Sequence, residues 1–248
     1  VDGRSEHLLV DRNAPVPPSF VRPDPRYRRI RTYESIGRSE YDGLYFRLDK
    51  RFDGRWQMLA TYNLGRGKAT SDSPFSIVAN PFNPDADYGP SSYVQRHRVA
   101  WSGVFVMPYG VTAGTIMSWA SPLPFTVTAG RDLNNDLTNN DRPVGVGRNS
   151  GGIAPEVDAI NAWRAANTLA PVTAEDLNGA NFFNWDLRLS RAFQLGGGVR
   201  IEGLAEVFNL TNRVNYLRFV TNARLATLGQ PTLAGDPRQV QFGARITF

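Results

Sequence analysis

The C-terminal stretch of this chain, residues 237–248, reads PRQVQFGARITF. From Val240 to Phe248 every second residue is apolar, and the residues between them are glutamine, glycine, arginine and threonine. This strict period of two predicts a strand with one apolar and one polar face. The strand ends on an aromatic residue with no polar tail. This alternation and this ending together favour the closing strand of a membrane β-barrel, with the polar face toward a lumen and the apolar face toward lipid. The alternative is an edge strand of a soluble β-protein.

The composition limits the class of protein. The chain has 248 residues and no cysteine, so disulfides and thiolate metal sites are excluded. No run of 18 apolar residues occurs, which excludes helical membrane spans and leaves alternating strands open. The sequence begins at Val1 without a start methionine or an apolar leader segment, so we expect a fragment or a trimmed chain.

The charge balance is basic, with a formal net charge of +5 carried almost entirely by arginine. A basic balance is one mark of nucleic-acid binding. Here the arginines are scattered along alternating strands and do not cluster, which favours lumen-facing positions and contacts with anionic lipid headgroups. We therefore expect outer-membrane lipid, and no nucleic acid, among the partners.

Seven long strands are expected from residue 41 onward. In the clearest of them, apolar residues alternate with asparagine, aspartate, arginine and serine, and Asp53-Gly54 is a strong hairpin signal between the first two. The expected strands are Tyr41–Phe52, Arg55–Leu64, Arg96–Met107, Val111–Ala129 (broken near Pro122 and Pro124), Phe183–Leu195, Val199–Phe208 and the terminal strand.

The connections between these strands alternate strictly in length. The short turns are 53–54, 108–110 and 196–198, and the long loops are 66–95, 130–181 and 209–236. Transmembrane barrels have short periplasmic turns and long extracellular loops, whereas a soluble sandwich has no physical reason to sort its loops by end. The sequence predicts an all-β, antiparallel, up-and-down transmembrane β-barrel segment. We expect it in the outer membrane of a Gram-negative-type bacterium.

Residues 1–40 are expected to lie outside the cell as a loop or hairpin. Residues 1–28 are rich in proline, which cannot sit in a central strand, and are expected to form an extended loop. Arg29–Ile36 is a candidate short strand, followed by a turn at 37–39.

Two further features are expected in the loops and at the strand ends. Residues 155–167 are predicted to form a short helix, because proline and acidic residues suit its first turn and Val157, Ile160 and Trp163 share a face. Aromatic residues at or near strand ends are expected to form interfacial girdles. They are Tyr62, Tyr93, Trp101, Tyr109, Trp119, Trp185, Phe193 and Phe248.

Five stretches carry a family resemblance by their order and spacing. They are 39–72 (SEYDGLYFRLDKRFDGRWQMLATYNLGRGKATSD), 97–110 (HRVAWSGVFVMPYG), 121–143 (SPLPFTVTAGRDLNNDLTNNDRP), 206–216 (EVFNLTNRVNY) and 236–248 (DPRQVQFGARITF). Together they resemble the C-terminal barrel region of TonB-dependent outer-membrane transporters, especially the Oar-like receptors with a carboxypeptidase-regulatory-like domain. The ending, with Gly243, Ile246 and Phe248, also resembles the signal read by the barrel assembly machinery.

The resemblance implies energised uptake of an extracellular substrate, which the sequence does not name. In such transporters the substrate binds the extracellular loops and a plug, and the TonB complex pulls on the plug from the periplasm. Transporter barrels of this kind have about 22 strands, so we expect 1–248 to be the C-terminal part of one. The alternatives are a small self-closed barrel, with Arg29–Ile36 as an eighth strand, or a soluble β-domain with a structural or adhesive role.

The loop 130–143 contains oxygen ligands at every second position, at Asp132, Asn134 and Asp136, with Asp141 downstream. This spacing resembles the start of a calcium loop, in which alternate side chains converge on a hard cation. The glycine expected after the third ligand is replaced by Leu137, and no glutamate occupies the twelfth position. A calcium site is one interpretation. The other is a turn-rich loop in which asparagine and aspartate hydrogen-bond their own backbone.

The sequence gives little support for an enzyme. His7 and His97 are the only histidines, and neither lies near a serine in a recognisable nucleophile setting. The carboxylates that alternate with arginines are expected to form cross-strand ion pairs and not acid–base pairs. They are Asp49, Asp186, Glu202 and Glu206. We expect no catalytic residues.

Overall fold

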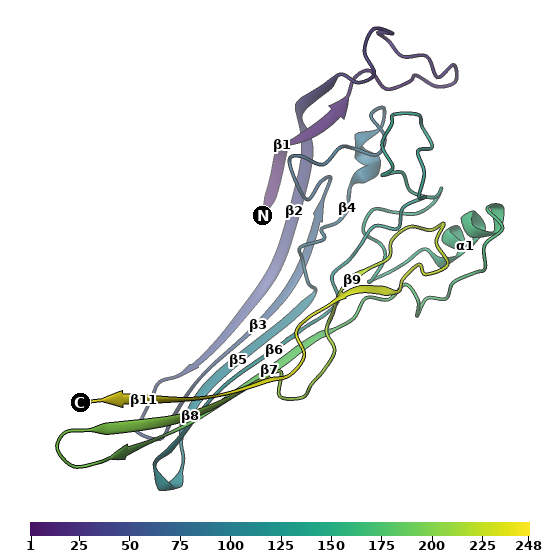
Figure 1. Ribbon diagram of the computed structural model, residues 1–248. Coiled ribbons are helices and arrows are strands. Elements are labelled where there is room, and N and C mark those ends of the chain that lie inside the picture. Colours follow the sequence, from purple (N-terminus) through teal and green to yellow (C-terminus); the bar gives the residue numbers. More distant parts are fainter.

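The computed structural model describes residues 1–248, and its main feature is one long, curved antiparallel sheet (Figure 1). Neighbouring strands follow in the order β1-β2-β3-β5-β6-β7-β8-β11, and the short β4 pairs with the end of β3. The all-β antiparallel expectation is confirmed. The strands are β1 (Asp2–Asp11), β2 (Arg31–Lys50), β3 (Trp56–Ala69), β4 (Gly89–Pro90), β5 (His97–Val106), β6 (Val111–Ala120), β7 (Phe182–Gln194), β8 (Arg200–Phe208) and β11 (Gln239–Thr247).

The connections are sorted by end, as the sequence predicts. Tight turns gather at one end of the sheet and long loops at the other, and the C-terminus lies at the tight-turn end (Figure 1). Each tight turn contains residues with positive φ, among them Gly54 (92°), Tyr109 (63°) and Gly197 (69°). The first turn covers residues 51–55 and is therefore longer than the expected two-residue hairpin.

Two N-terminal expectations are wrong. Residues 2–11 form β1, not an extended loop, because the prolines begin at Pro15 and the earlier residues keep their backbone donors for pairing with Arg31–Glu40. The expected turn at 37–39 is part of one continuous β2. Gly37 lies opposite a register shift in β1, and a Cβ there would stand 3.0 Å from the Glu6 carbonyl oxygen, so the glycine permits close approach and not a turn.

The strand expected over Val111–Ala129 is shorter than predicted. β6 ends at Ala120, immediately before Ser121-Pro122, because proline removes a ladder donor. Beyond it, Phe125 and Thr128 make only isolated bridges, to Gly151 and Asn222. The third long loop carries its own small hairpin, formed by β9 (Tyr216–Phe219) and β10 (Pro231–Ala234).

The sheet has one apolar and one polar face, because directly paired residues point to the same side. One row across five strands is aromatic and aliphatic, consisting of Phe46, Tyr62, Val99, Trp119 and Phe183. A second apolar row near the tight turns includes Trp56, Phe105, Leu189 and Phe242. The opposite face carries rows such as Arg47, Thr61, Ala100, Ser118 and Asn184.

Aromatic side chains mark both ends of the apolar face. Near the loops the Tyr62 hydroxyl and His97 Nδ1 are 2.8 Å apart, and near the turns the Trp56 and Phe105 rings stack with centroids 6.2 Å apart. Tyr62 and Trp56 are six residues apart on β3, which is about 20 Å at about 3.3 Å per residue. The girdle expectation is wrong for Trp101, which lies in the middle of β5 opposite Ala60 and Met117.

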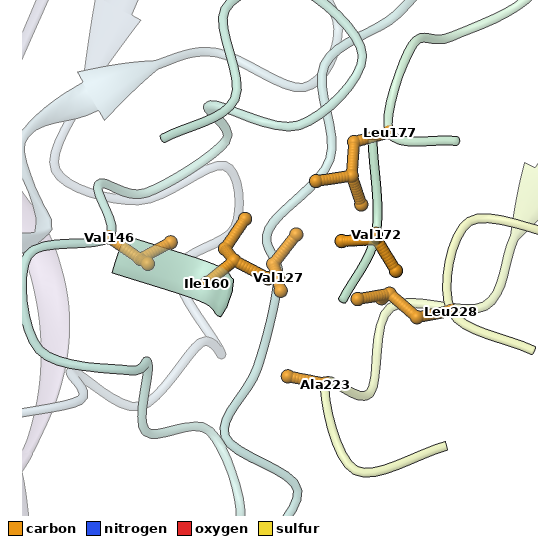
Figure 2. Packing of buried hydrophobic residues seen from close by; sticks show 7 residues of the cluster. All are labelled: Val127, Val146, Ile160, Val172, Leu177, Ala223 and Leu228. Atoms are coloured by element: carbon orange, nitrogen blue, oxygen red, sulfur yellow. The ribbon is translucent and has the colours of Figure 1, made fainter. Parts of the chain in front are cut away.

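The main hydrophobic core lies in the loops, beside the helix α1 (Val157–Ala166) that the sequence predicts (Figure 1). Side chains from three separate segments point toward one another there (Figure 2). They are Val127, Val146, Ile160, Val172, Leu177, Ala223 and Leu228. The second and third long loops therefore fold together as one packed layer. No helix of the structure is long and apolar enough to cross a membrane.

The sheet does not close on itself, since β1 and β11 form its two ends. β1 pairs only with the first half of β2, from Arg31 to Glu40, and the β1 side of residues 42–50 has no partner strand. The outer edge of β11 is also unpaired. The alternative of a small self-closed barrel is therefore not the observed arrangement, and the expected open barrel segment is.

Candidate functional site

Two surfaces of the molecule have the polar character of a ligand-contacting site. One is the polar face of the sheet, where a hollow of about 650 Å³ has a mixed lining from β2, β3, β5, β6, β7 and β8, with charged residues such as Asp49, Asp186, Arg188 and Glu206 beside apolar ones such as Leu59, Val104 and Ile116. The other is the loop layer at the end of the sheet. We define the loop layer as residues 70–96, 121–181 and 209–238, which include α1.

Some charged groups on the polar face form ion pairs or hydrogen bonds with one another. Arg188 Nη1 lies 3.4 Å from Glu206 Oε1, and Gln241 Nε2 donates to the same carboxylate. Asp186 Oδ1 accepts hydrogen bonds from Asn184 Nδ2 (2.8 Å) and from the Asn209 backbone N–H (2.9 Å). The cross-strand pairing expected for Glu206 is confirmed.

Asp49 departs from that expectation. It pairs with Arg47 of its own strand at 3.0 Å instead of with a neighbouring strand. Glu202 forms none of the ion pairs of the structure.

Two buried ion pairs join the first long loop to the second. Arg142 Nη1 lies 2.6 Å from Asp87 Oδ1, and Arg148 pairs with Asp72; all four side chains are at most 14% exposed. Between them lies a polar cavity of about 240 Å³. Burial raises the pKa of Asp72, but hydrogen bonds from Ser92 and the charge of Arg148 hold it below its ordinary value. The cavity is therefore lined by fixed charges of both signs.

Arg164 joins the second long loop to the third. It lies in the last turn of α1, is 2% exposed, and donates to the carbonyl oxygens of Ala170 (2.6 Å), Ala223 (2.9 Å) and Leu225 (2.9 Å). The sequence pattern alone did not single out this residue. The helical spacing could have indicated that Arg164 is buried, because it lies four residues after the buried Ile160 and so on the same helix face.

The loop 130–143 forms the hydrogen-bonded turns that one interpretation expects. Asp132 Oδ1 accepts from the Asn134 N–H (3.2 Å), Asn134 Oδ1 from that of Asp136 (3.0 Å), and Asp136 Oδ1 from that of Thr138 (2.7 Å). Asp141 Oδ2 accepts a hydrogen bond from the Leu133 N–H at 2.8 Å, which connects the end of this loop to its beginning. No group of three or more histidine, cysteine, aspartate or glutamate side chains in the structure could hold a metal ion.

The third predicted group, Gly243, Ile246 and Phe248, lies along β11 and beyond it. Ile246 pairs with Ile201 on the apolar face, and Gly243 lies on the polar face opposite Leu204. Phe248 follows the end of the strand and is 99% exposed. These residues form a linear terminal segment and not a binding site.

The family model of the outer membrane beta barrel domain matches residues 4–241. This match agrees with the alternating faces, the sorted loops and the aromatic rows. This chain belongs to that family. The outer-membrane barrel domain therefore lies in the outer membrane, and the alternative of a soluble β-domain is wrong. No curated protein matches the chain by sequence.

Solved structures similar to this chain include an outer-membrane transporter and two receptors. The outer membrane transporter YddB from Escherichia coli matches with a TM-score of 0.53 and 9% identity, covering 99% of this chain and 28% of that one. The siderophore receptor PiuA from Acinetobacter baumannii matches with a TM-score of 0.49 and 11% identity, over 99% of this chain and 24% of that one. The ferric-catecholate import receptor Fiu from E. coli matches with a TM-score of 0.46 and 14% identity, covering 86% of this chain and 22% of that one.

At these identities the likeness shows the fold alone. The barrel domain spans about a quarter of the length of these structures, between 22% and 28%. Within the membrane its apolar face meets lipid, since Leu44, Leu48 and Ile246 are each about 60% exposed on that face. Its polar face is left to the interior of the barrel.

Proposed function

We propose that this chain is the C-terminal barrel portion of a TonB-dependent outer-membrane transporter of the Oar-like class. One observation carries the proposal. A sheet with a polar and a lipid-facing side and two unpaired edges matches, over 99% of its length, a 28% share of an outer-membrane transporter, with a TM-score of 0.53. Such a sheet is a wall segment that further strands complete.

The unpaired edges supply the physical reason for further strands. Residues 42–50 of β2 and the outer edge of β11 present backbone donors and acceptors without partner strands. In hydrocarbon each unsatisfied group costs several kcal/mol, so an open sheet cannot remain in lipid. The remaining strands of a larger barrel pair with both edges and remove this cost.

In this transporter the polar face lines the passage and the loop layer meets the substrate first. The paired charges on the polar face keep the wall hydrated and rigid, and the cavity between Asp72, Asp87, Arg142 and Arg148 offers donors and acceptors of both signs. The TonB complex acts from the periplasm on a plug that closes the barrel. The substrate is extracellular and its identity is set by the loops.

Uptake can be tested before the substrate is identified. Cells with and without the gene are grown in complex medium, and mass spectrometry follows which compounds leave the medium, with TonB present or deleted. We expect at least one compound to disappear only when both the gene and TonB are present. Equal depletion profiles, or depletion that persists without TonB, would contradict the proposal.

The orientation is tested with single cysteines, because the natural chain has none. Val144 in the second long loop is 89% exposed and Tyr109 in a tight turn is 86% exposed. A membrane-impermeant maleimide applied to whole cells should label Val144→Cys and spare Tyr109→Cys until the outer membrane is opened. The reverse pattern would place the long loops in the periplasm and rule out their capture of an extracellular substrate.

A further inference from the structure

The net positive charge of the chain is concentrated in one segment. Residues 12–31, which connect β1 to β2 and include the first residue of β2, contain six arginines and one acidic residue, Asp24. The whole chain has 28 basic and 23 acidic residues, so the rest of it is electrically neutral. The expectation that arginines do not cluster is therefore wrong here. We call residues 12–31 the basic segment.

The basic segment lies at the end of the molecule opposite the tight turns (Figure 1). Phe46, in the aromatic row near the loops, and Arg31 both belong to β2 and are 15 residues apart, which is about 50 Å at about 3.3 Å per residue. With a strand tilt of about 45°, the segment stands roughly 35 Å above that row. The headgroup layer extends only about 5–8 Å beyond the hydrocarbon, so the segment is out of reach of its phosphates.

Four arginines of the basic segment have no carboxylate partner. Arg12 pairs with Glu34, and Arg26 pairs with Asp24. The other four form none of the ion pairs of the structure, and all but the first of them are exposed; they are Arg22, Arg28, Arg29 and Arg31. A guanidinium group offers five N–H donors in a planar fork that matches a carboxylate or a phosphate. The segment therefore presents unneutralised charge together with free donors.

Two of these four arginines are held in place without being neutralised. Arg22 Nη2 donates to the Asn135 carbonyl oxygen (2.7 Å) and its Nη1 to that of Asn13 (2.9 Å). Arg29 donates to the Leu137 carbonyl oxygen. A neutral carbonyl fixes the position of a guanidinium and leaves its charge in place. Binding an anion then costs less ordering of these side chains, because part of the surface is already arranged.

The basic segment is an open surface and does not enclose a ligand. Neither the hollow on the polar face nor the polar cavity in the loop layer is lined by any of its residues. A small ligand usually needs a concave site that surrounds it. A chain with repeated acid groups can instead bind an open surface through several weak contacts at once. The surface therefore fits an extended polyanion.

The segment lacks the elements that recognise nucleic acid. Base edges are read by helices or strands that enter a groove, and residues 12–30 contain neither. Single strands are bound by stacking successive bases on aromatic rings. The segment has only Phe20 and Tyr27, and the Arg26 guanidinium already lies over the Tyr27 ring, 5.6 Å from its centroid. An acidic saccharide chain needs only the charges and donors that are present.

We propose that the basic segment binds the acid groups of a soluble anionic polysaccharide outside the cell, through Arg28, Arg29 and Arg31 with Arg22 beside them. The positive potential of the segment also raises the rate at which such a chain arrives. This inference rests on the proposed function for its place in uptake, where it names an acidic saccharide as the class of substrate. The binding itself requires no transport.

The test uses the full-length protein purified from outer membranes in detergent. Fluorescence anisotropy follows the binding of a labelled deca-galacturonate, in which every ring carries a carboxylate. A neutral maltodextrin and an oligothymidylate of the same length are the comparison ligands. We expect the galacturonate to bind most tightly, and its affinity to fall roughly tenfold between about 50 and 200 mM NaCl, since about three charge contacts are screened. An affinity independent of salt, equal binding of the neutral chain, or tighter binding of the oligothymidylate would overturn the proposal.

Two double variants localise the binding. Arg28→Gln with Arg31→Gln removes two exposed, unpaired charges of the basic segment, and should lower the affinity about tenfold and leave the Tm unchanged. Arg55→Gln with Arg200→Gln removes the same charge from exposed positions near the tight turns and should bind like the parent. Equal affinities of the two double variants would show that net charge alone attracts the chain, and the proposal would fail. A parent protein that binds the galacturonate without TonB-dependent depletion of any compound would refute the transporter and leave the binding surface standing.

Discussion

The wall and the loop layer are stabilised in different ways. All seven residues of the main hydrophobic core lie in the loop layer, from Val127 to Leu228, and none lies in a long strand of the sheet. The strands instead expose large apolar residues such as Leu44, Phe242 and Ile246. The loop layer therefore folds as a water-soluble domain does, by burying its own side chains, whereas the wall depends on backbone pairing and on lipid.

The largest effect is expected in the loop layer, at Arg164. Arg164→Met should destabilise that layer by about 3–5 kcal/mol, because three buried carbonyl oxygens lose their shared donor. Proteolysis of residues 130–181 should accelerate sharply, while the β-sheet signal in circular dichroism stays unchanged. Arg224→Met, at an exposed position in the third long loop, is the matched control. Simultaneous loss of the sheet would show that wall and loops are one cooperative unit.

The wall should respond to charge on its lipid face. Leu187 pairs with Thr115 and Val207 between the two aromatic rows. Leu187→Arg should lower the free energy of unfolding in lipid vesicles by about 2–4 kcal/mol, because arginine is poorly solvated near the bilayer midplane. Ser190→Arg, on the polar face of the same strand, should change it little. Equal effects at the two positions would contradict the assignment of the faces.

The terminal residue should affect assembly and not the folded wall. Phe248 lies beyond β11 and is 99% exposed, so its deletion removes no strand pairing. We expect the deletion to reduce the amount of protein in the outer membrane several-fold, as judged by immunoblotting of membrane fractions. Phe242→Ala removes a lipid-facing phenylalanine of β11 itself and should reduce it much less. Unchanged surface levels after the deletion would leave Phe248 without a signalling role.

The smallest effect is expected in the tight turn at residues 51–55. The Lys50 side chain, together with the backbone N–H groups of Arg55 and Trp56, lowers the pKa of Asp53 from 3.8 to about 2. The folded-state pKa is depressed, so this contribution to stability is present above pH 3.8 and is lost as the pH falls through about 2. The small Tm difference between the parent and Asp53→Asn should vanish over that range. A difference independent of pH would assign the effect to the turn geometry.

The sequence predicted the wall far better than it predicted the site. Alternation located β3, β5, β7, β8 and β11, because a strand between lipid and lumen must alternate along its whole length. It failed at the N-terminus, where the Pro15–Pro25 cluster suggested a loop for all of 1–28, although β1 precedes the first proline. It also identified the oxygen-rich loop 130–143 from local spacing alone.

The sequence by itself determined the alternating faces, the sorting of short turns and long loops, and the presence of a short helix within 155–167. These are local properties, set by side-chain period and turn chemistry within a few residues. Only the tertiary structure decided that Asp72 meets Arg148 and Asp87 meets Arg142 across long loops, and that one oxygen of the Asp136 carboxylate, Oδ2, is buried without a hydrogen-bond partner. It also decided that β11, the closing strand, has one paired and one free edge. Such contacts join residues far apart in the chain, and their energies depend on burial, which no local pattern encodes.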